Sequence, residues 1–218
     1  MNLSRGKKIT ILVLLVLIAD QISKIWIKTN MTLGESISVL GNWFKIYFIE
    51  NNGMAFGMQF GGLAGKLFLT LFRLVLAGFI LYYLNKLIKK RETPFGVLVG
   101  IALIFIGAVG NIVDSVFYGV IFSESTFTQT AVMFPEGGGY APLLFGKVVD
   151  MLYFPIIHTT LPDWFPFRAG EEFIFFRPIF NIADSCITVG VTYLIIFHRK
   201  YFTSVSPSAS GGKSVSGS

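Results

Sequence analysis

The chain has 218 residues, of which 53% are hydrophobic, and its mean hydropathy of +0.68 is too high for an ordinary soluble domain. Its 18 Lys and Arg residues outnumber 12 Asp and Glu residues, but the basic residues group beside long apolar segments, which argues against a nucleic-acid-binding protein. Cys186 is the only cysteine, so we expect neither a disulfide framework nor a cysteine-based metal site.

Four apolar segments follow one another along the chain. Each is close to the roughly 20 residues that a helix needs to cross about 30 Å of hydrocarbon. We predict transmembrane helices at about residues 9–28, 63–85, 95–114 and 179–197. The first segment follows a basic start, as in a secretory signal peptide, but no small-residue cleavage site follows it. We therefore interpret it as an uncleaved first transmembrane helix.

Basic residues are concentrated at three places: the start of the chain, the loop between the second and third segments, and the end of the fourth. These residues are Arg5, Lys7, Lys8, Lys86, Lys89, Lys90, Arg91, Arg199 and Lys200. Four crossings put all three places on one side of the membrane, and the positive-inside rule makes that side cytoplasmic. Both termini are then cytoplasmic, and the long loops 29–62 and 115–178 lie on the outer side.

The sequence predicts an all-α membrane protein with four transmembrane helices, a small β-sheet on the outer face, and loop insertions there. Residues 45–50 alternate between polar and apolar side chains, which is typical of a strand. Residues 1–202 are expected to form a single membrane-embedded domain. The Ser- and Gly-rich residues 203–218 are expected to be a disordered or appended tail.

Three aspartates fall in or beside the apolar segments, where a charge is costly. At about 1.5 Å per residue, Asp20 lies about 18 Å, Asp184 about 21 Å and Asp114 about 30 Å from the cytoplasmic ends of their helices. Each one alone has a structural explanation, since Asp184 can cap a helix and Asp20 can pair with Lys24. Asp20 and Asp114 are expected at helix C-terminal ends, where the dipole opposes them. Together, the aspartates favour a polar site near the outer membrane face.

Five short motifs occur in order along the chain: DQISK (20–24), ENNGMAFG (50–57), GNIVD (110–114), VVDM (148–151) and FNIADS (180–185). On a pattern of four apolar helices, their order and placement resemble the signal peptidase II family, also called lipoprotein signal peptidases. Members of this family are aspartyl proteases of the bacterial inner membrane. The resemblance covers about residues 9–200.

The resemblance implies that Asp150 and Asp184 are the catalytic pair. It implies supporting or substrate-binding positions at Asp20, Lys24, Asn51, Gly53, Asn111, Asp114 and Asn181. Without it, Asp150 would rank below Asp114, because it is expected in an outer loop. Two carboxylates that share a site hold one proton between them, so one activates water while the other polarises the scissile carbonyl. No metal and no cofactor are then expected.

The resemblance also implies the substrate and the location. The substrate is a prolipoprotein whose cysteine already carries a diacylglyceryl group, and the cut falls N-terminal to that lipidated cysteine. The enzyme is expected to contact membrane lipid, to act as a monomer in the bacterial inner membrane with its site on the periplasmic side, and to be inhibited by the peptide antibiotic globomycin.

Two features depart from the family pattern. Ser115 stands where the family commonly has Arg after the GNIVD-type motif, and insertions occupy residues 122–147 and 155–176. The first insertion is either a flexible flap over the site or a solvated loop.

Three other functional classes stay open at this point. A proton-coupled transporter or small channel also places charges in helices. A metal-dependent hydrolase could use Asp114, Asp150 and Asp184, although no further Glu or His completes a ligand shell. A purely structural membrane protein is the third class.

Overall fold

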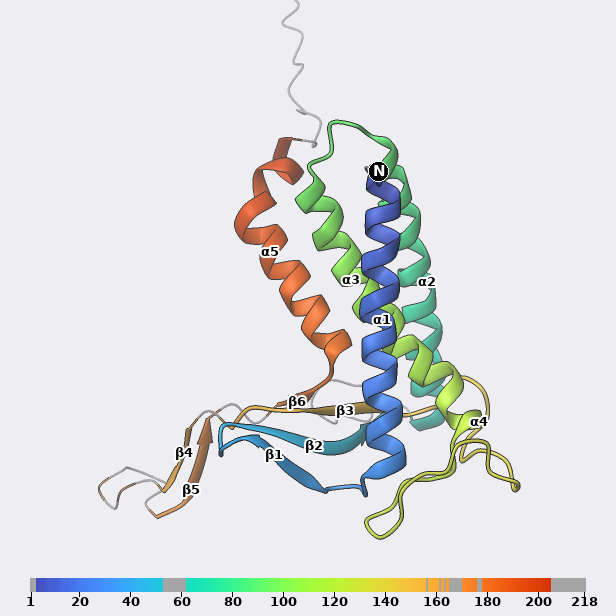
Figure 1. Cartoon of the computed structure of the whole chain (residues 1–218), viewed down its shortest axis with the longest axis vertical. Helices are drawn as coiled ribbons and strands as arrows, with labels where there is room; N and C mark the ends of the chain where they lie inside the picture. Colours follow the sequence, from blue (N-terminus) through green and yellow to red (C-terminus); the bar gives the residue numbers. More distant parts are fainter. Residues whose placement is uncertain are drawn as a thin grey trace, which may run out of the picture.

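The molecule is a bundle of four long helices with a β-sheet across one end (Figure 1). The computed structural model describes residues 3–52, 62–155, 157–160, 162, 164, 170–175 and 178–204. Within this part of the chain the long helices are α1 (Arg5–Asn30), α2 (Gly62–Lys89), α3 (Phe95–Val113) and α5 (Ile182–Ser204). All four are long and apolar enough to cross a membrane, so the predicted fold class is confirmed.

The third helix is longer than the sequence suggested. After Val113 the helical path continues through a π-helix, η2 (Asp114–Tyr118), and a short helix, α4 (Gly119–Ile121). Asp20 likewise lies in the interior of α1. The expectation that Asp20 and Asp114 stand at helix C-terminal ends is therefore wrong. Both carboxylates have a buried cationic partner, so neither needs a helix end where water can solvate it.

The fourth helix begins later than predicted, because Ile179–Phe180 form a short strand, β6. Asn181 caps the start of α5, because its Oδ1 accepts a hydrogen bond of 2.9 Å from the backbone N–H of Asp184. The Asp184 carboxylate in turn accepts one of 3.4 Å from the backbone N–H of Asn181. This is a reciprocal capping arrangement. Asp184 is thus a helix-capping residue, whatever its chemical role.

The sheet at the end of the bundle is antiparallel, with strand order β1-β2-β3-β6. Its longer strands are β1 (Ser36–Leu40), β2 (Phe44–Asn51) and β3 (Val148–Tyr153). The register pairs Asp150 on β3 with Ile49 on β2, which places Asp150 near the end of β2 that carries Asn51. A separate pair of strands, β4 (Ile157–Thr160) and β5 (Glu172–Phe175), projects to one side of the sheet (Figure 1). This pair lies in the second insertion.

Close packing of α3 against α5 brings the motifs on these helices together. A Cβ atom on Gly107 would lie 2.2 Å from the carbonyl oxygen of Ala183, and one on Gly190 would lie 2.7 Å from that of Gly100. Only glycine allows the two backbones to approach so closely at these positions. The start of α5, with Asp184, is therefore held directly beside the C-terminal half of α3.

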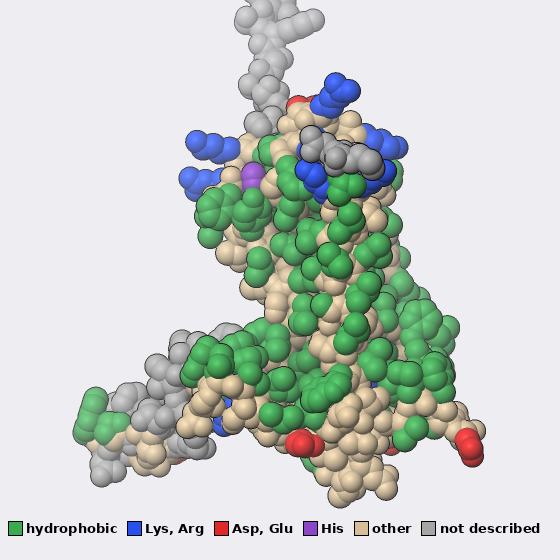
Figure 2. All heavy atoms as spheres, viewed as in Figure 1, with side chains coloured by type: hydrophobic (Ala, Val, Ile, Leu, Met, Phe, Trp, Pro, Cys, Tyr) green, Lys and Arg blue, Asp and Glu red, His purple; other side chains and the backbone are tan. Residues whose placement is uncertain are grey.

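The surface of the bundle matches a membrane environment. Large apolar side chains are exposed along α1, α2 and α5, among them Leu15, Phe68, Val75 and Ile195. Figure 2 shows Lys and Arg side chains gathered at the end of the bundle away from the sheet, and hydrophobic side chains between the two ends. The protein is thus a multi-pass membrane protein.

The first insertion is anchored to the protein along its length. The backbone N–H of Ala131 donates to the Lys28 carbonyl at 3.0 Å, and that of Leu33 donates to the Thr126 carbonyl at 2.9 Å. Phe122 and Ala131 are buried in a hydrophobic cluster with residues of α1, β2 and β3. Residues 122–147 are therefore tied at several points to the end of α1 beside the sheet, while other residues of this segment, among them Phe127 and Phe134, are exposed.

Candidate active site

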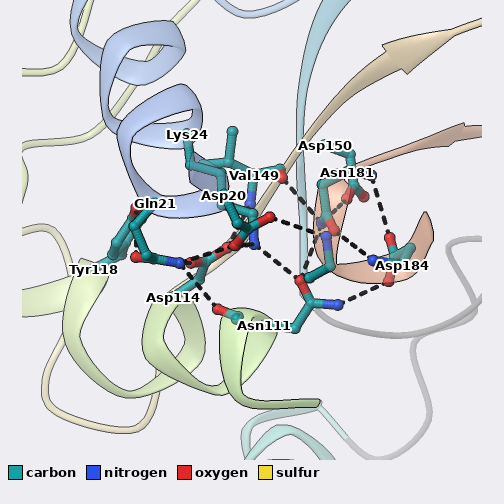
Figure 3. A network of polar contacts seen from close by, with 12 residues as sticks. Asp20, Gln21, Lys24, Asn111, Asp114, Tyr118, Val149, Asp150, Asn181 and Asp184 are labelled. Atoms are coloured by element: carbon teal, nitrogen blue, oxygen red, sulfur yellow. Dashed lines mark hydrogen bonds and ion pairs between the residues drawn. The ribbon is translucent and has the colours of Figure 1, made fainter. Parts of the chain in front are cut away.

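The ammonium group of Lys24 is the centre of a buried polar network (Figure 3). Its Nζ lies 2.9 Å from Asp20 Oδ2 and 2.8 Å from Asp114 Oδ2, and all three side chains are fully buried. It also donates to Asn111 Oδ1 at 3.0 Å. The three donors of the ammonium are thereby used. The predicted ion pair between Asp20 and Lys24 is present, and Lys24 also binds Asn111 on α3 and Asp114, which directly follows α3.

Gln21 reinforces the same charged group. Its Nε2 donates to Asp20 Oδ2 and to Asp114 Oδ1, both at 3.1 Å, and to the Gly110 carbonyl at 3.2 Å. The Tyr118 hydroxyl donates to Gln21 Oε1 at 3.1 Å. Sequence analysis quoted Gln21 within its motif but gave it no role, and it overlooked Tyr118. A polar amide in the middle of a transmembrane helix was the available signal.

Two asparagine amides, those of Asn111 and Asn181, connect the predicted catalytic pair to this network (Figure 3). Asn111 Nδ2 donates to Asp184 Oδ1 at 2.8 Å. Asn181 Nδ2 donates to Asp150 Oδ1 at 2.8 Å and to Asn111 Oδ1 at 3.0 Å. Asn51 Nδ2 reaches Asp150 Oδ2 at 3.4 Å. Each carboxylate of the pair therefore receives amide hydrogen bonds from residues that belong to other motifs.

The carboxylates bound to Lys24 also hold the backbone on which the pair stands. Asp20 Oδ1 accepts a hydrogen bond of 3.0 Å from the N–H of Ala183. Asp114 Oδ2 accepts one of 3.3 Å from the N–H of Val149. Ala183 and Val149 immediately precede the two predicted catalytic aspartates. The charged network thus fixes the position of the predicted catalytic pair through the main chain.

Asp150 has an unusual electrostatic environment for a carboxyl group. Its side chain is only 3% exposed. Burial, and then the neighbouring charge of Asp184, raise its pKa to about 7, while hydrogen bonds from Asn51 and Asn181 and the charge of Lys24 act in the opposite direction. At neutral pH such a group holds its proton about half of the time, which suits proton transfer.

A second buried cluster joins α1 to the first insertion. Lys28 forms an ion pair with Glu50 and donates to Ser125 Oγ at 2.8 Å, and its Nζ lies 4.9 Å from the centre of the Tyr140 ring. Lys147 reaches the other Glu50 oxygen at 3.4 Å. Sequence analysis did not identify this cluster, because its members come from three distant segments. It ties β2 and the insertion to the C-terminal end of α1.

Three further expectations from the sequence concern Gly53, Ser115 and a metal site. Gly53 lies outside the described residues. Ser115 is buried, and within the described part of the chain its hydroxyl has no hydrogen-bond partner. Among the described residues, no group of three or more His, Cys, Asp or Glu side chains is arranged to hold a metal ion.

Comparison with known proteins identifies the family. A family model described as "Signal peptidase (SPase) II" matches residues 12–200. A lipoprotein signal peptidase of Porphyromonas gingivalis is 52% identical over 199 residues, which is 91% of this chain and 86% of that protein. The chain belongs to the signal peptidase II family. It is thus an enzyme of a family that processes prolipoproteins.

More distant relatives extend the same result. A lipoprotein signal peptidase of Amoebophilus asiaticus is 37% identical over 85% of this chain and 75% of its own length. A solved structure described as a bacterial membrane enzyme, determined by the in meso method, superposes with a TM-score of 0.59 at 26% identity. That superposition covers 96% of this chain and 95% of the solved one.

The buried network predicts a large effect of removing its cation. Lys24→Met leaves the carboxylates of Asp20 and Asp114 together in the protein interior without a counter-charge. Breaking a buried ion pair in this way costs about 3–5 kcal/mol. We expect the variant to unfold at a much lower temperature in detergent micelles, or to fail to fold.

The matched control is Lys86→Met, which removes an exposed lysine from α2. Its melting temperature should stay close to that of the unmodified protein. Equal stability of Lys24→Met and Lys86→Met would show that the Lys24 network does not hold the site together.

Proposed function

We propose that this chain is an aspartyl endopeptidase that removes the signal peptide from diacylglyceryl-modified prolipoproteins, cutting on the N-terminal side of the lipidated cysteine. The observation that carries the proposal is that Asn181 connects Asp150 and Asp184, through its side chain and its backbone N–H respectively. Asn181 donates to the Asp150 carboxylate, and its backbone N–H donates to that of Asp184. Membership of the signal peptidase II family supports the same reaction.

The proposed chemistry needs one ionised and one protonated carboxyl group. The ionised group takes a proton from water as the water oxygen forms a bond to the scissile carbonyl carbon. The protonated group gives its proton to the carbonyl oxygen, which produces a neutral tetrahedral intermediate. When the C–N bond breaks, the carboxyl group that is now protonated gives its proton to the leaving nitrogen. The ionised carboxylate takes a proton from one hydroxyl of the intermediate, so that the new carboxyl group forms and the pair returns to its starting state. The raised pKa of Asp150 supports this division of protonation states near neutral pH.

The position of the pair supports a lipidated substrate. Asp184 lies in the first turn of α5, and Asp150 lies on the sheet at the end of the bundle. Both are therefore close to the same end of the apolar helices. The acyl chains of a substrate can remain in the lipid beside the exposed apolar side chains while the peptide bond reaches the polar network.

The same arrangement supports an orientation. We propose that both termini are cytoplasmic and that the sheet and the catalytic pair face the periplasmic side of the bacterial inner membrane. The basic end of the bundle lies opposite the sheet (Figure 2), as the positive-inside rule requires. We further propose that the enzyme acts as a monomer. One copy per lipid nanodisc should therefore be fully active, and activity that needs two copies would refute the monomer.

Substitution of either aspartate tests the proposed chemistry. Asp150→Asn and Asp184→Asn nearly preserve shape but remove the base and the carboxylic acid, so each should reduce turnover at least about 100-fold in folded protein. Asp114→Asn should lose stability or part of the rate, because Asp114 pairs with Lys24 and holds the backbone of Val149 but is not proposed to take part in the chemistry. Glu136→Gln, at an exposed position, is the control. Near-normal turnover of Asp150→Asn with an inactive Asp114→Asn would transfer the catalytic role to Asp114.

A second prediction concerns the lipid on the substrate. The diacylglyceryl-modified precursor should be cleaved much faster than the same precursor without lipid, because the acyl chains hold the peptide at the membrane surface. Cleavage is measured with purified enzyme by release of the signal peptide, in the presence and absence of a strong chelator. Equal rates for both precursors would indicate a general membrane protease, and loss of activity with chelator would indicate a metal-dependent hydrolase.

A third prediction concerns the orientation. In a Cys186→Ser background, a cysteine at position 89 should react with an impermeant reagent only from the cytoplasmic side, and one at position 136 only from the outer side. Positions 89 and 136 lie at opposite ends of the bundle, at the end of α2 and in the first insertion. Labelling of both from the same side would refute the four-crossing topology.

A further inference from the structure

Lys66 is a buried lysine near the start of the membrane-spanning helix α2, at the end of the bundle that carries the sheet (Figure 1). The residue is only 6% exposed. Within the described part of the chain no carboxylate forms an ion pair with it, in contrast to Lys24, which pairs with Asp20 and Asp114. An ammonium group is costly to bury in such a helix unless polar groups surround it. The partners of Lys66 therefore decide what its charge does.

These partners are two backbone carbonyl oxygens from different segments. Lys66 Nζ donates to the carbonyl of Asn52 at 2.9 Å and to that of Gly146 at 2.5 Å. Asn52 directly follows β2, and Gly146 lies two residues before β3. Two carbonyl oxygens are both acceptors and cannot bond to each other, so a donor is needed between them. The ammonium group thus joins the ends of two strands that are distant in sequence.

This junction lies beside the contact between Asn51 and Asp150. The ladder between β2 and β3 ends with the pair Asn51 and Val148, and Lys66 binds the two chains just beyond that pair. Asn51 is also the residue whose Nδ2 reaches Asp150 Oδ2 at 3.4 Å. Because strand ends open more easily than strand centres, a donor at this place limits the movement of Asn51 relative to Asp150.

The segment before β3 is fixed on its other side by the π-helix η2. The backbone N–H of Gly146 donates to the carbonyl of Ser115 at 2.9 Å. A Cβ atom on Gly146 would lie 2.1 Å from the carbonyl oxygen of Asp114, so only glycine permits this approach. Since η2 holds this segment in place, the hydrogen bond from Lys66 to Asn52 determines where the end of β2 lies.

The other contacts that orient Asp150 do not depend on β2. Asn181 Nδ2, at the start of α5, donates to Asp150 Oδ1 at 2.8 Å. The backbone N–H of Val149 is held by the Asp114 carboxylate at 3.3 Å. These contacts fix Asp150 relative to α5 and to the end of α3. The contact from Asn51 comes instead from β2, whose end Lys66 holds.

We propose that Lys66 is a positioning residue for the reaction: its ammonium group ties the end of β2 to the segment before β3 and thereby sets the amide of Asn51 against the carboxyl group of Asp150. Without this tie, the end of β2 moves and Asp150 loses the hydrogen bond from Asn51, while the one from Asn181 remains. This role rests on the proposed function, because it matters to turnover only if Asp150 takes part in the chemistry.

The test is a double-mutant cycle between Lys66 and Asn51, with Lys86→Met, an exposed substitution on the same helix, as the matched control. The kcat and KM for a diacylglyceryl-modified prolipoprotein are measured for Lys66→Met, Asn51→Ala and the double variant. Each single substitution should lower kcat about 10-fold with KM little changed, because the reaction is sensitive to small displacements of the groups around the reacting atoms. The double variant should be about as slow as either single variant, since Lys66 acts through Asn51. Lys86→Met should keep the kcat of the unmodified enzyme.

If Lys66→Met does not fold, the cycle is made with Lys66→Gln, which keeps a donor but is too short to bind both carbonyls. A purely structural role for Lys66 would lower the yield of folded enzyme but leave the kcat of the folded fraction unchanged, and this result overturns the proposal. A double variant that is slower by the product of the two single effects, about 100-fold, also overturns it, because Lys66 would then act independently of Asn51. Failure of the unmodified enzyme to cleave the lipidated precursor would instead overturn the proposed function itself.

Discussion

The rest of the site depends on the buried ion pairs that the ammonium group of Lys24 forms with Asp20 and Asp114. The desolvation of this ammonium group is offset only because two carboxylates and one amide oxygen surround it at 2.8 to 3.0 Å. The same carboxylates accept the backbone N–H groups of Ala183 and Val149. One charged group in α1 thus determines where α3, β3 and α5 meet. The glycine contacts between α3 and α5 make that meeting sterically possible.

The same network also orients the groups that are proposed to carry out the chemistry. Asn111 and Asn181 connect the network to the proposed catalytic pair, Asp150 and Asp184, and hold both carboxylates in fixed orientations before any substrate binds. Preorganised polar groups of this kind need no reorganisation during the reaction. Asn181 serves twice, since it also caps α5. The capping role of Asp184 and its proposed catalytic role are therefore compatible, because the cap fixes the carboxylate in place.

Local sequence patterns predicted the helices well, because length and apolar composition decide whether a segment can cross a membrane. They also predicted the pairing of Asp20 with Lys24, which are four residues apart on one helix. Asp150 could be chosen only through a family motif, because its burial depends on the pairing of β2 with β3, distant in sequence. The cluster around Lys28 was missed for the same reason: packing between distant segments, and not a local pattern, creates it.

The central claim is that Asp150 carries the proton that the catalytic pair shares. Infrared titration of the protonated carboxyl stretch, from about pH 5 to about pH 9, tests this most directly. We expect a band in the unmodified enzyme that disappears with a midpoint at about 7, is absent from Asp150→Asn, and persists in Asp20→Asn. A band that persists unchanged in Asp150→Asn, or no protonated carboxyl near neutral pH, would contradict the account.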